Sequence, residues 1–330
     1  MTGTRRTPRD KVDGWLNLDK PVGLGSTPAV GKVRRLFNAL KVGHGGTLDP
    51  LASGVLPIAL GEATKTVQWV MDGRKVYRFA IAFGQATTTD DLEGTVVEEA
   101  AARPSDAALR AALDDFTGEI DQVPPAFSAL KIEGARAYDL ARRGEAVELA
   151  SRRVRVDRLV LLDRPSADRA ELEVECGKGT YVRSLARDIA RAVGTVGHVA
   201  ALRRTVCGPF CIDDAVTLAA LEAAAANSLS NPGAFGHKPA LLGHLRPVVT
   251  ALDDIPALAL TDRQADRLSG GVALPMAEIA GAKSPTIGTM SPAEGSAEPA
   301  HIVRAMAGAR LVAIARIDGD LLRPVRVLNL

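Results

Sequence analysis

The segment GHGGTLDPLASGVLP, residues 43–57, places four glycines and two prolines around a single carboxylate, that of Asp49. A residue before proline avoids the helical region and aspartate is common in turns, so an Asp-Pro turn is the simplest interpretation. Gly43, Gly45 and Gly46, however, remove side chains on one side of Asp49, which would let another backbone approach. His44 lies in the same glycine-rich stretch, although a single histidine is usually structural. The segment is therefore a candidate site whose meaning depends on the rest of the chain.

Length and composition set the class of protein. The 330 residues suit one large domain and a smaller one, and 46% hydrophobic with 24% charged residues is typical of a soluble globular chain. The net charge of +2 does not by itself indicate a nucleic-acid-binding protein. Cys176, Cys207 and Cys211 have no metal-site spacing, and neither a signal peptide nor an apolar run of membrane-spanning length is present. We expect a cytoplasmic protein with reduced thiols and no membrane partner.

Local patterns predict a mixture of strands and helices. Residues 14–20, 75–83, 152–162 and 170–176 read as strands, and residues 26–40 and 181–194 as helices, the first of them capped by Ser26 or Thr27. Because the elements do not repeat as βαβ units, we expect an α+β fold with a mixed, largely antiparallel sheet flanked by helices.

Composition suggests where the domains divide. Residues 1–12 are polar and expected to be disordered, and residues 13–221 form the first domain. An Ala-, Ser-, Asn-, Gly- and Pro-rich stretch at 222–247 reads as a linker. Residues 248–330 are expected to form a small β-rich domain that carries a Gly-, Pro- and Ser-rich insertion at 281–299.

A basic helix is the second candidate for function. Arg183, Arg187 and Arg191 recur at every fourth residue and so share one helix face, with Lys178 just before them. Such a face is either a solvated surface or a row of phosphate contacts. Tyr77 and Tyr181 are two of only three tyrosines, and aromatic rings either pack in a core or stack on a flipped base.

No cofactor motif is present. The segment GSTPAVGKV, residues 25–33, is close to a phosphate-binding loop but has one residue too many between its glycines and lacks the Ser or Thr that would reach magnesium. No dinucleotide fingerprint follows a strand, and no His/Cys cluster suggests a metal site. A reaction without cofactor or metal is favoured.

Together these segments closely resemble one family, the bacterial tRNA pseudouridine-55 synthases of the TruB type. The resemblance runs over roughly residues 13–215. It rests on GWLNLDKPVG (14–23), VGHGGTLDPLASGVLPIALGEATK (42–65), KVYRFAIAFG (75–84) with TTTDDLEG (87–94), CGKGTYVRSLARDIA (176–190) and HVAALRRT (198–205). The last part of the chain resembles a PUA domain more weakly.

The resemblance implies a pseudouridine synthase fold and a role for each matching residue. Asp49 matches the catalytic aspartate, Tyr77 the aromatic residue that packs on the target base, and Arg183 the basic partner of the aspartate. His44 would help to hold the opened T-loop and Leu202 would line the base pocket. The other residues expected to contact substrate RNA are Lys20, Asp91, Tyr181, Lys178, Arg187 and Arg191. An RNA-binding insertion is expected at about 122–152 and a PUA-like RNA-binding domain at 248–330. The sequence departs from the family pattern at residues 24–27 and at Thr88.

The implied activity is isomerisation of the T-loop uridine of tRNA to pseudouridine by a monomer. The base leaves its ribose at N1 and rejoins through C5, and one ionised carboxylate is enough, whereas glycoside hydrolysis would use two. The sequence does not choose between a covalent adduct of Asp49 and proton abstraction from the sugar. Two other functions stay open, a non-catalytic tRNA-binding chaperone and a guide-RNA-dependent relative.

Overall fold

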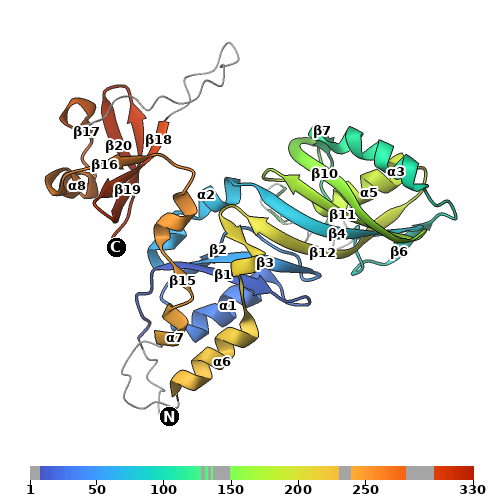
Figure 1. Ribbon diagram of the computed structural model, residues 1–330, viewed down its shortest axis with the longest axis horizontal. Coiled ribbons are helices and arrows are strands. Elements are labelled where there is room, and N and C mark those ends of the chain that lie inside the picture. The colour runs from blue at the N-terminus through green and yellow to red at the C-terminus, as the bar shows by residue number, and fades with distance from the viewer. Residues whose placement is uncertain (1–7, 128–130, 133–134, 137–148, 230–238, 280–300) are drawn as a thin grey trace.

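The computed structural model describes residues 8–127, 131–132, 135–136, 149–229, 239–279 and 301–330, and its largest feature is one mixed sheet (Figure 1). The central path of this sheet runs β14-β1-β3-β12-β4-β11-β10-β7, and β2, β13 and β15 pair at its side. The strands of the path are β1 (Gly14–Lys20), β3 (Ala52–Leu60), β4 (Lys75–Phe83), β7 (Gly118–Gln122), β10 (Arg152–Ser166), β11 (Arg169–Cys176), β12 (Gly197–Cys207) and β14 (Val216–Thr217). The side strands are β2 (Val42–His44), β13 (Phe210–Cys211) and β15 (Leu245–Arg246).

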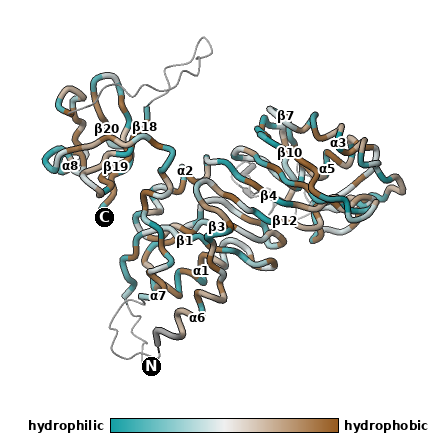
Figure 2. Tube along the Cα trace, viewed as in Figure 1, coloured by the Kyte–Doolittle hydropathy of each residue, from teal (hydrophilic) through white to brown (hydrophobic). Residues whose placement is uncertain are grey.

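Most neighbouring strands of this sheet are antiparallel, and in its described part the parallel pairs are β1 with β14 and β3 with β12. The predicted α+β class is therefore confirmed, as are the strands expected at 14–20, 75–83, 152–162 and 170–176. Along β11 every second residue is buried, whereas the central strands β1 and β3 are buried almost throughout. Figure 2 shows how hydrophobic and polar residues are distributed along the chain. Two short hairpins, β5 (Gln85–Thr87) with β6 (Val96–Glu99) and β8 (Lys131–Ile132) with β9 (Ala135–Arg136), stand apart from this sheet.

Most helices pack against this sheet, and the last one packs against a separate C-terminal sheet. They are α1 (Ser26–Leu36), α2 (Val67–Asp72), α3 (Asp106–Leu113), α5 (Val182–Ala192), α6 (Leu218–Leu229), α7 (Pro239–Leu242) and α8 (Asp262–Ser269), with single 3₁₀ turns at η1 (Gly61–Lys65), η2 (Asp114–Phe116), η3 (Ile212–Asp214), η4 (Val248–Leu252) and η5 (Met276–Glu278). Leu185 and Ile189 of α5 are fully buried in the main core, which fixes α5 against β12 and β4. Arg183, in the first turn of α5, is drawn inward by the same packing.

A second sheet of five strands forms the C-terminal part (Figure 1). Its order is β16 (Ala257–Ala259), β18 (His301–Ala307), β19 (Arg310–Asp318), β20 (Leu321–Val327) and β17 (Leu274–Pro275). The predicted β-rich character of this region is confirmed. The side chains of Leu311, Ile314 and Leu328 pack in one hydrophobic cluster with Trp15 and Phe210 of the large sheet. The two parts of the chain thus share a hydrophobic core.

Three local expectations differ from the structure. Residues 8–12 are paired rather than disordered, since Asp10 N donates to Asn38 O at 2.9 Å and Val12 is buried. The stretch 222–247 is not an irregular linker over its described part, because α6 and α7 place Leu221, Ala225 and Leu241 in the main core. Alanine-rich sequence forms helix readily, and these apolar side chains give it a face to bury.

The third difference is the cap of α1, which is Gly25 and makes no side-chain bond, because Ser26 is used elsewhere. The insertion at 281–299 and most of the segment 122–152 beyond Phe127 lie outside the described residues. Within the described part, no helix has both the length and the hydropathy to cross a membrane.

Candidate active site

The centre of the site is an arginine held between two aspartates. Arg183 Nε lies 3.0 Å from Asp49 Oδ2, and Arg183 Nη1 lies 3.3 Å from Asp91 Oδ2. The Nε–Asp49 contact is a close ion pair without hydrogen-bond alignment, since Nε has no aligned acceptor. Side-chain exposure is 5% for Arg183 and 3% for Asp91 but 35% for Asp49. Of the two carboxylates on Arg183, Asp49 is therefore the one that a substrate can reach.

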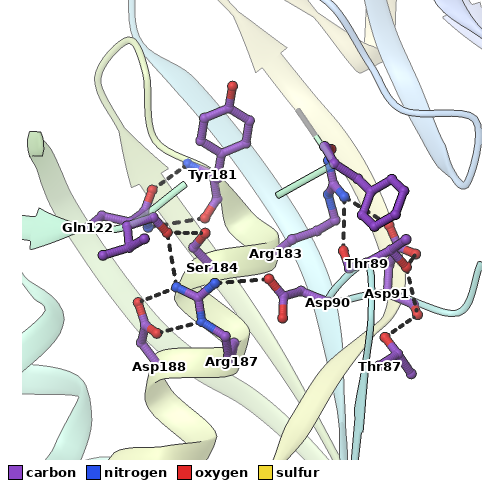
Figure 3. Close-up of polar contacts among 12 residues, drawn as sticks. Thr87, Thr89, Asp90, Asp91, Gln122, Tyr181, Arg183, Ser184, Arg187 and Asp188 are labelled. Atoms are coloured by element: carbon purple, nitrogen blue, oxygen red, sulfur yellow. Dashed lines mark hydrogen bonds and ion pairs between the residues drawn. The ribbon is translucent and has the colours of Figure 1, made fainter. Parts of the chain in front are cut away.

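Backbone carbonyls fix the same guanidinium. Arg183 Nη1 donates to Thr89 O and Nη2 to Phe127 O, each at 2.9 Å. Figure 3 shows Arg183 reaching from α5 to the loop that carries Thr89 and Asp91. Asp91 is itself locked, because its Oδ1 accepts from Glu93 N and from the Thr89 hydroxyl. Arg183 cannot turn without losing contacts to both loops.

The segment around Asp49 is anchored by its neighbours. The Ser26 hydroxyl bonds both backbone groups of Leu48 at 2.8 Å, and Ala52 N donates to Asp49 O at 3.1 Å. Gly45 does not open a path for RNA as expected, since a Cβ there would meet Val70 Cγ1 at 2.7 Å. Gly43 has open space at the Cβ position and fits the expectation. The rigid Asp-Pro segment thus presents the Asp49 carboxylate from a fixed backbone.

Tyr77 and Leu202 lie on neighbouring strands beside this segment. Tyr77 of β4 pairs with Arg204 of β12, and Leu202 pairs with Ala52 three residues after Asp49. Burial raises the pKa of Tyr77 to about 12, so its phenol stays protonated at neutral pH. Tyr77 packs against the main core and is half-buried, so it both fills the core and keeps an accessible part.

His44 lies at the end of β2, and Gly46 N donates to its Nδ1 at 3.4 Å. Burial, and then the charge of Arg204, lower the pKa of His44, so the imidazole is neutral at pH 7. A neutral, half-buried ring is suited to stacking and hydrogen bonding rather than to ion pairing.

Three residues expected to contact RNA are held inside the protein. Lys20 is fully buried and donates to Pro21 O at 3.0 Å and Leu24 O at 2.6 Å. Burial lowers the pKa of Lys20 to about 8, while the charge of Asp49 acts in the opposite direction. Asp91 is occupied by Arg183, and Arg187 is 16% exposed in its ion pairs. We do not expect Lys20, Asp91 or Arg187 to contact RNA directly, because the charged group of each is already bonded within the protein.

Arg187 instead joins α5 to two loops. Its Nη1 lies 2.9 Å from Asp90 Oδ2, its Nε 2.8 Å from Asp188 Oδ1, and its Nη2 donates to Val123 O at 2.9 Å (Figure 3). Asp90 has a φ of 58°, a left-handed conformation that aspartate tolerates at some cost. Burial raises the pKa of Asp90, and the charge of Arg187 opposes that rise.

The remaining expected contacts face outward. Lys178 is 71% exposed and pairs with Asp72 at 2.9 Å, and Arg191 is exposed in the last turn of α5. Tyr181 is half-buried, with its backbone bonded to the Gln122 side chain and Arg152 Cζ 4.8 Å from its ring centroid. These groups remain available to an anionic ligand.

From the sequence, Ser26, Asp90 and Arg204 were given no role in holding the site in place, although each bonds to backbone or side chains of the site. The consecutive pair Asp90-Asp91 was visible as a signal, but the pairing of each with its own arginine was not. Among the described residues, no three His, Cys, Asp or Glu side chains are grouped closely enough to hold a metal ion.

Comparison with family models decides the family. The model of the TruB family pseudouridylate synthase N-terminal domain matches residues 34–182, and that of the tRNA pseudouridylate synthase B C-terminal domain matches residues 183–253. The chain belongs to the TruB family. The range matched by the first model includes Asp49 and Tyr77, and the range matched by the second begins at Arg183.

Curated relatives and solved structures agree with TruB membership. The chain is 51% identical to tRNA pseudouridine synthase B of Gluconacetobacter diazotrophicus, covering 98% of this chain and 100% of the relative. It is 47% identical to the Rhodospirillum rubrum protein of that name, covering 99% and 100%. A solved Cbf5-Nop10-Gar1 complex contains a chain with a TM-score of 0.70 and 26% identity, covering 95% of this chain and 84% of the other. The pseudouridine synthase fold expected from the sequence is thereby confirmed.

Proposed function

We propose that the chain is an isomerase that converts the T-loop uridine of tRNA to pseudouridine. The observation that carries the proposal is the partly exposed Asp49 carboxylate, which lies 3.0 Å from the buried Arg183. Relatives that match the whole chain at about 50% identity are named tRNA pseudouridine synthase B. Their names support tRNA as the substrate and favour it over guide-RNA-dependent action.

The reaction breaks the N1–C1′ bond, turns the base and forms a C5–C1′ bond; C5 loses its proton and N1 gains one, so there is no net redox change. In either chemical route, addition to the sugar or removal of a sugar proton, Asp49 must be ionised and aimed. Arg183 aims the carboxylate as a preorganised charge. Leu202 and the protonated Tyr77 would enclose the base and exclude water, which would otherwise intercept the detached sugar.

Binding of the T-arm would involve the outward-facing groups Lys178, Arg191 and Tyr181. Flipping the uridine out of the folded loop costs a few kcal/mol, which contacts to phosphate and stacking must offset. The C-terminal sheet would add affinity as a PUA-like unit. The chain would act on tRNA as a monomer in the cytoplasm. A non-catalytic chaperone would have no need of the Asp49–Arg183 pair.

The test is Asp49→Asn, which removes the charge and keeps the shape. We expect loss of tritium release from C5-labelled uridine in tRNA transcripts, with the affinity for tRNA nearly unchanged. Asp163→Asn is the matched control, because Asp163 is exposed and bonds only to the neighbouring Arg164 N in the described structure. A transcript with cytidine at the T-loop position tests the proposed target. Turnover by Asp49→Asn within about tenfold of the unaltered chain would refute its role.

A further inference from the structure

Arg204 is a fully buried cation placed between three parts of the site. It lies on β12, where it pairs with Tyr77 of β4 on one side and Gly54 of β3 on the other. Its side chain is enclosed, with an exposure of 1%. Arg204 Nε donates to Val55 O at 2.8 Å and Nη2 donates to Gly46 O at 3.0 Å. One guanidinium therefore joins β3 to the backbone that leads into Asp49.

The same group lies beneath the aromatic ring of the site. Arg204 Cζ is 6.0 Å from the centroid of the Tyr77 ring, within range of a cation–π contact. The charge of Arg204 also opposes the rise in the pKa of Tyr77 that burial causes. Displacement of the guanidinium would thus change both the position and the electrostatic environment of the ring.

No carboxylate neutralises this arginine within the described part of the chain, where its hydrogen-bond acceptors are backbone carbonyls. A buried charge without a counter-ion is costly, and core positions are more often filled by apolar side chains. Backbone dipoles offset part of that cost only while all of them stay aimed at the guanidinium. The hydrogen bonds of Arg204 therefore restrict the positions of the Val55 and Gly46 carbonyls as well as that of the arginine.

Two glycines of the Asp49 segment lie against Arg204. A Cβ at Gly54 would lie 2.2 Å from Arg204 O, and Gly54 has a φ of +99°. A Cβ at Gly46, with a φ of +133°, would lie 3.4 Å from Arg204 Nη1. Gly54 is therefore required by the close approach of the Arg204 backbone, whereas at Gly46 the contact is ordinary and the positive φ is what favours glycine.

We propose that Arg204 is a positioning residue for the reaction, one that sets the Asp49 segment and the Tyr77 ring relative to each other. It acts through the Gly46 and Val55 carbonyls and the ring, without touching the substrate. The inference rests on the proposed pseudouridine synthase activity. Lysine cannot replace it, because a single ammonium on a flexible stem does not span two carbonyls and a ring face at once.

The matched pair of variants is Arg204→Lys and Arg203→Lys. The two arginines are consecutive on β12 and point to opposite faces, and Arg203 is 41% exposed and paired with Asp19. We expect Arg204→Lys to lower the single-turnover rate at saturating tRNA by roughly 10- to 100-fold, because small misplacements of reacting groups have effects of that size. The dissociation constant for tRNA should stay within about threefold, and Arg203→Lys should change neither quantity by more than that. Arg204→Met, which keeps the volume and removes the donors, should behave like Arg204→Lys.

A second measurement reports position without catalysis. The chain has three tyrosines, so 3-fluorotyrosine gives three fluorine resonances, assigned by single Tyr→Phe changes. Arg204→Lys should shift the Tyr77 resonance and Arg203→Lys should leave it in place. If the unaltered chain releases no tritium, the proposed activity fails while the fluorine shift still tests the link between Arg204 and Tyr77.

Three results would each contradict the proposal. One is a single-turnover rate for Arg204→Lys and Arg204→Met within about threefold of the unaltered chain. The second is loss of tRNA binding together with collapse of all three resonances, which would make Arg204 a general folding residue. The third is an unmoved Tyr77 resonance, which would exclude the ring as its target.

Discussion

Arg183 and Asp49 are joined through Nε and Oδ2 at 3.0 Å, although one side chain is buried and the other is one-third exposed. The two terminal nitrogens of Arg183 contact Asp91 and donate to two backbone carbonyls. Asp49 therefore has a rigid partner on one side and open space on the other. This asymmetry is what a reactive carboxylate needs, because the charge is aimed before the substrate arrives.

One turn along α5, Arg187 repeats the arrangement with Asp90, so two consecutive aspartates pair with two arginines. We predict that Arg187→Gln and Asp90→Asn each destabilise the fold by about 2–4 kcal/mol, since breaking a buried ion pair leaves one charge unpaired. Both side chains are about 15% exposed, which keeps the cost below that of a fully enclosed pair. Urea unfolding of the single and double variants measures it.

The double variant should be less destabilised than the sum of the two single ones, with a coupling of about 1–3 kcal/mol. The single-turnover rate should fall with each variant, because the 87–91 loop also carries Asp91 and so supports Arg183. Additive effects on stability would show that Arg187 and Asp90 act independently, and an unchanged rate would separate this pair from the site.

The lowered pKa of Lys20 predicts that both activity and stability depend on pH. Its pKa lies near 8 instead of 10.5, so its ammonium is present below about pH 8 and is lost above it. The charge supports Asp49, so kcat/KM, which reports the free enzyme, should fall as the pH rises through about 8. For stability the sign is opposite: the cost of burying the charged form applies below the folded pKa and disappears as the pH rises from 8 toward 10.5.

Lys20→Met should have a lower kcat/KM at pH 7 and lack the decline near pH 8. Measurement of kcat/KM from pH 6 to 9 for both chains tests this. Persistence of the same decline in Lys20→Met would assign it to another group, such as the uridine of the substrate.

The sequence predicted four strands of the sheet, at 14–20, 75–83, 152–162 and 170–176, and the basic helix, because those depend on local periodicity. It also indicated Asp49, since an acid among glycines before a proline is a local pattern. The partners of Arg187 and Arg204 could not be predicted, because Asp90 lies 97 residues and Gly46 158 residues away. The α6 segment was misjudged for a related reason, as low-complexity alanine sequence gives little sign of the core that Leu221 and Ala225 enter.

The shared core predicts that the position of a C-terminal truncation matters. A chain ending at 247 loses Val248, Ala251 and Leu252 of η4, which pack against the first sheet, whereas a chain ending at 255 keeps them. Both lose the packing of the C-terminal strands. We expect the 1–255 chain to melt about 10 °C above the 1–247 chain, from the loss of two or three buried aliphatic side chains.

The 1–255 chain should keep its single-turnover rate at saturating tRNA and show a higher KM, because the catalytic groups precede it in the chain. Equal melting temperatures for the two truncated chains would show that η4 contributes nothing to the first sheet. A large loss of rate in the 1–255 chain would mean that the C-terminal sheet acts on the chemistry.

The final prediction concerns Arg183→Lys. Arginine satisfies Asp49, Asp91, Thr89 O and Phe127 O at once because its donors spread over a rigid plane, and a lysine ammonium can reach only some of them. We expect a loss of about 10²-fold or more in single-turnover rate at saturating tRNA, the size seen when a preorganised electrostatic partner is removed. Arg191→Ala, an exposed residue two turns along α5, should weaken tRNA binding and its salt dependence instead, with the rate at saturation near that of the unaltered chain. If Arg183→Lys reacts as fast as Arg191→Ala at saturation, the pairing of Arg183 with Asp49 does not serve the chemistry.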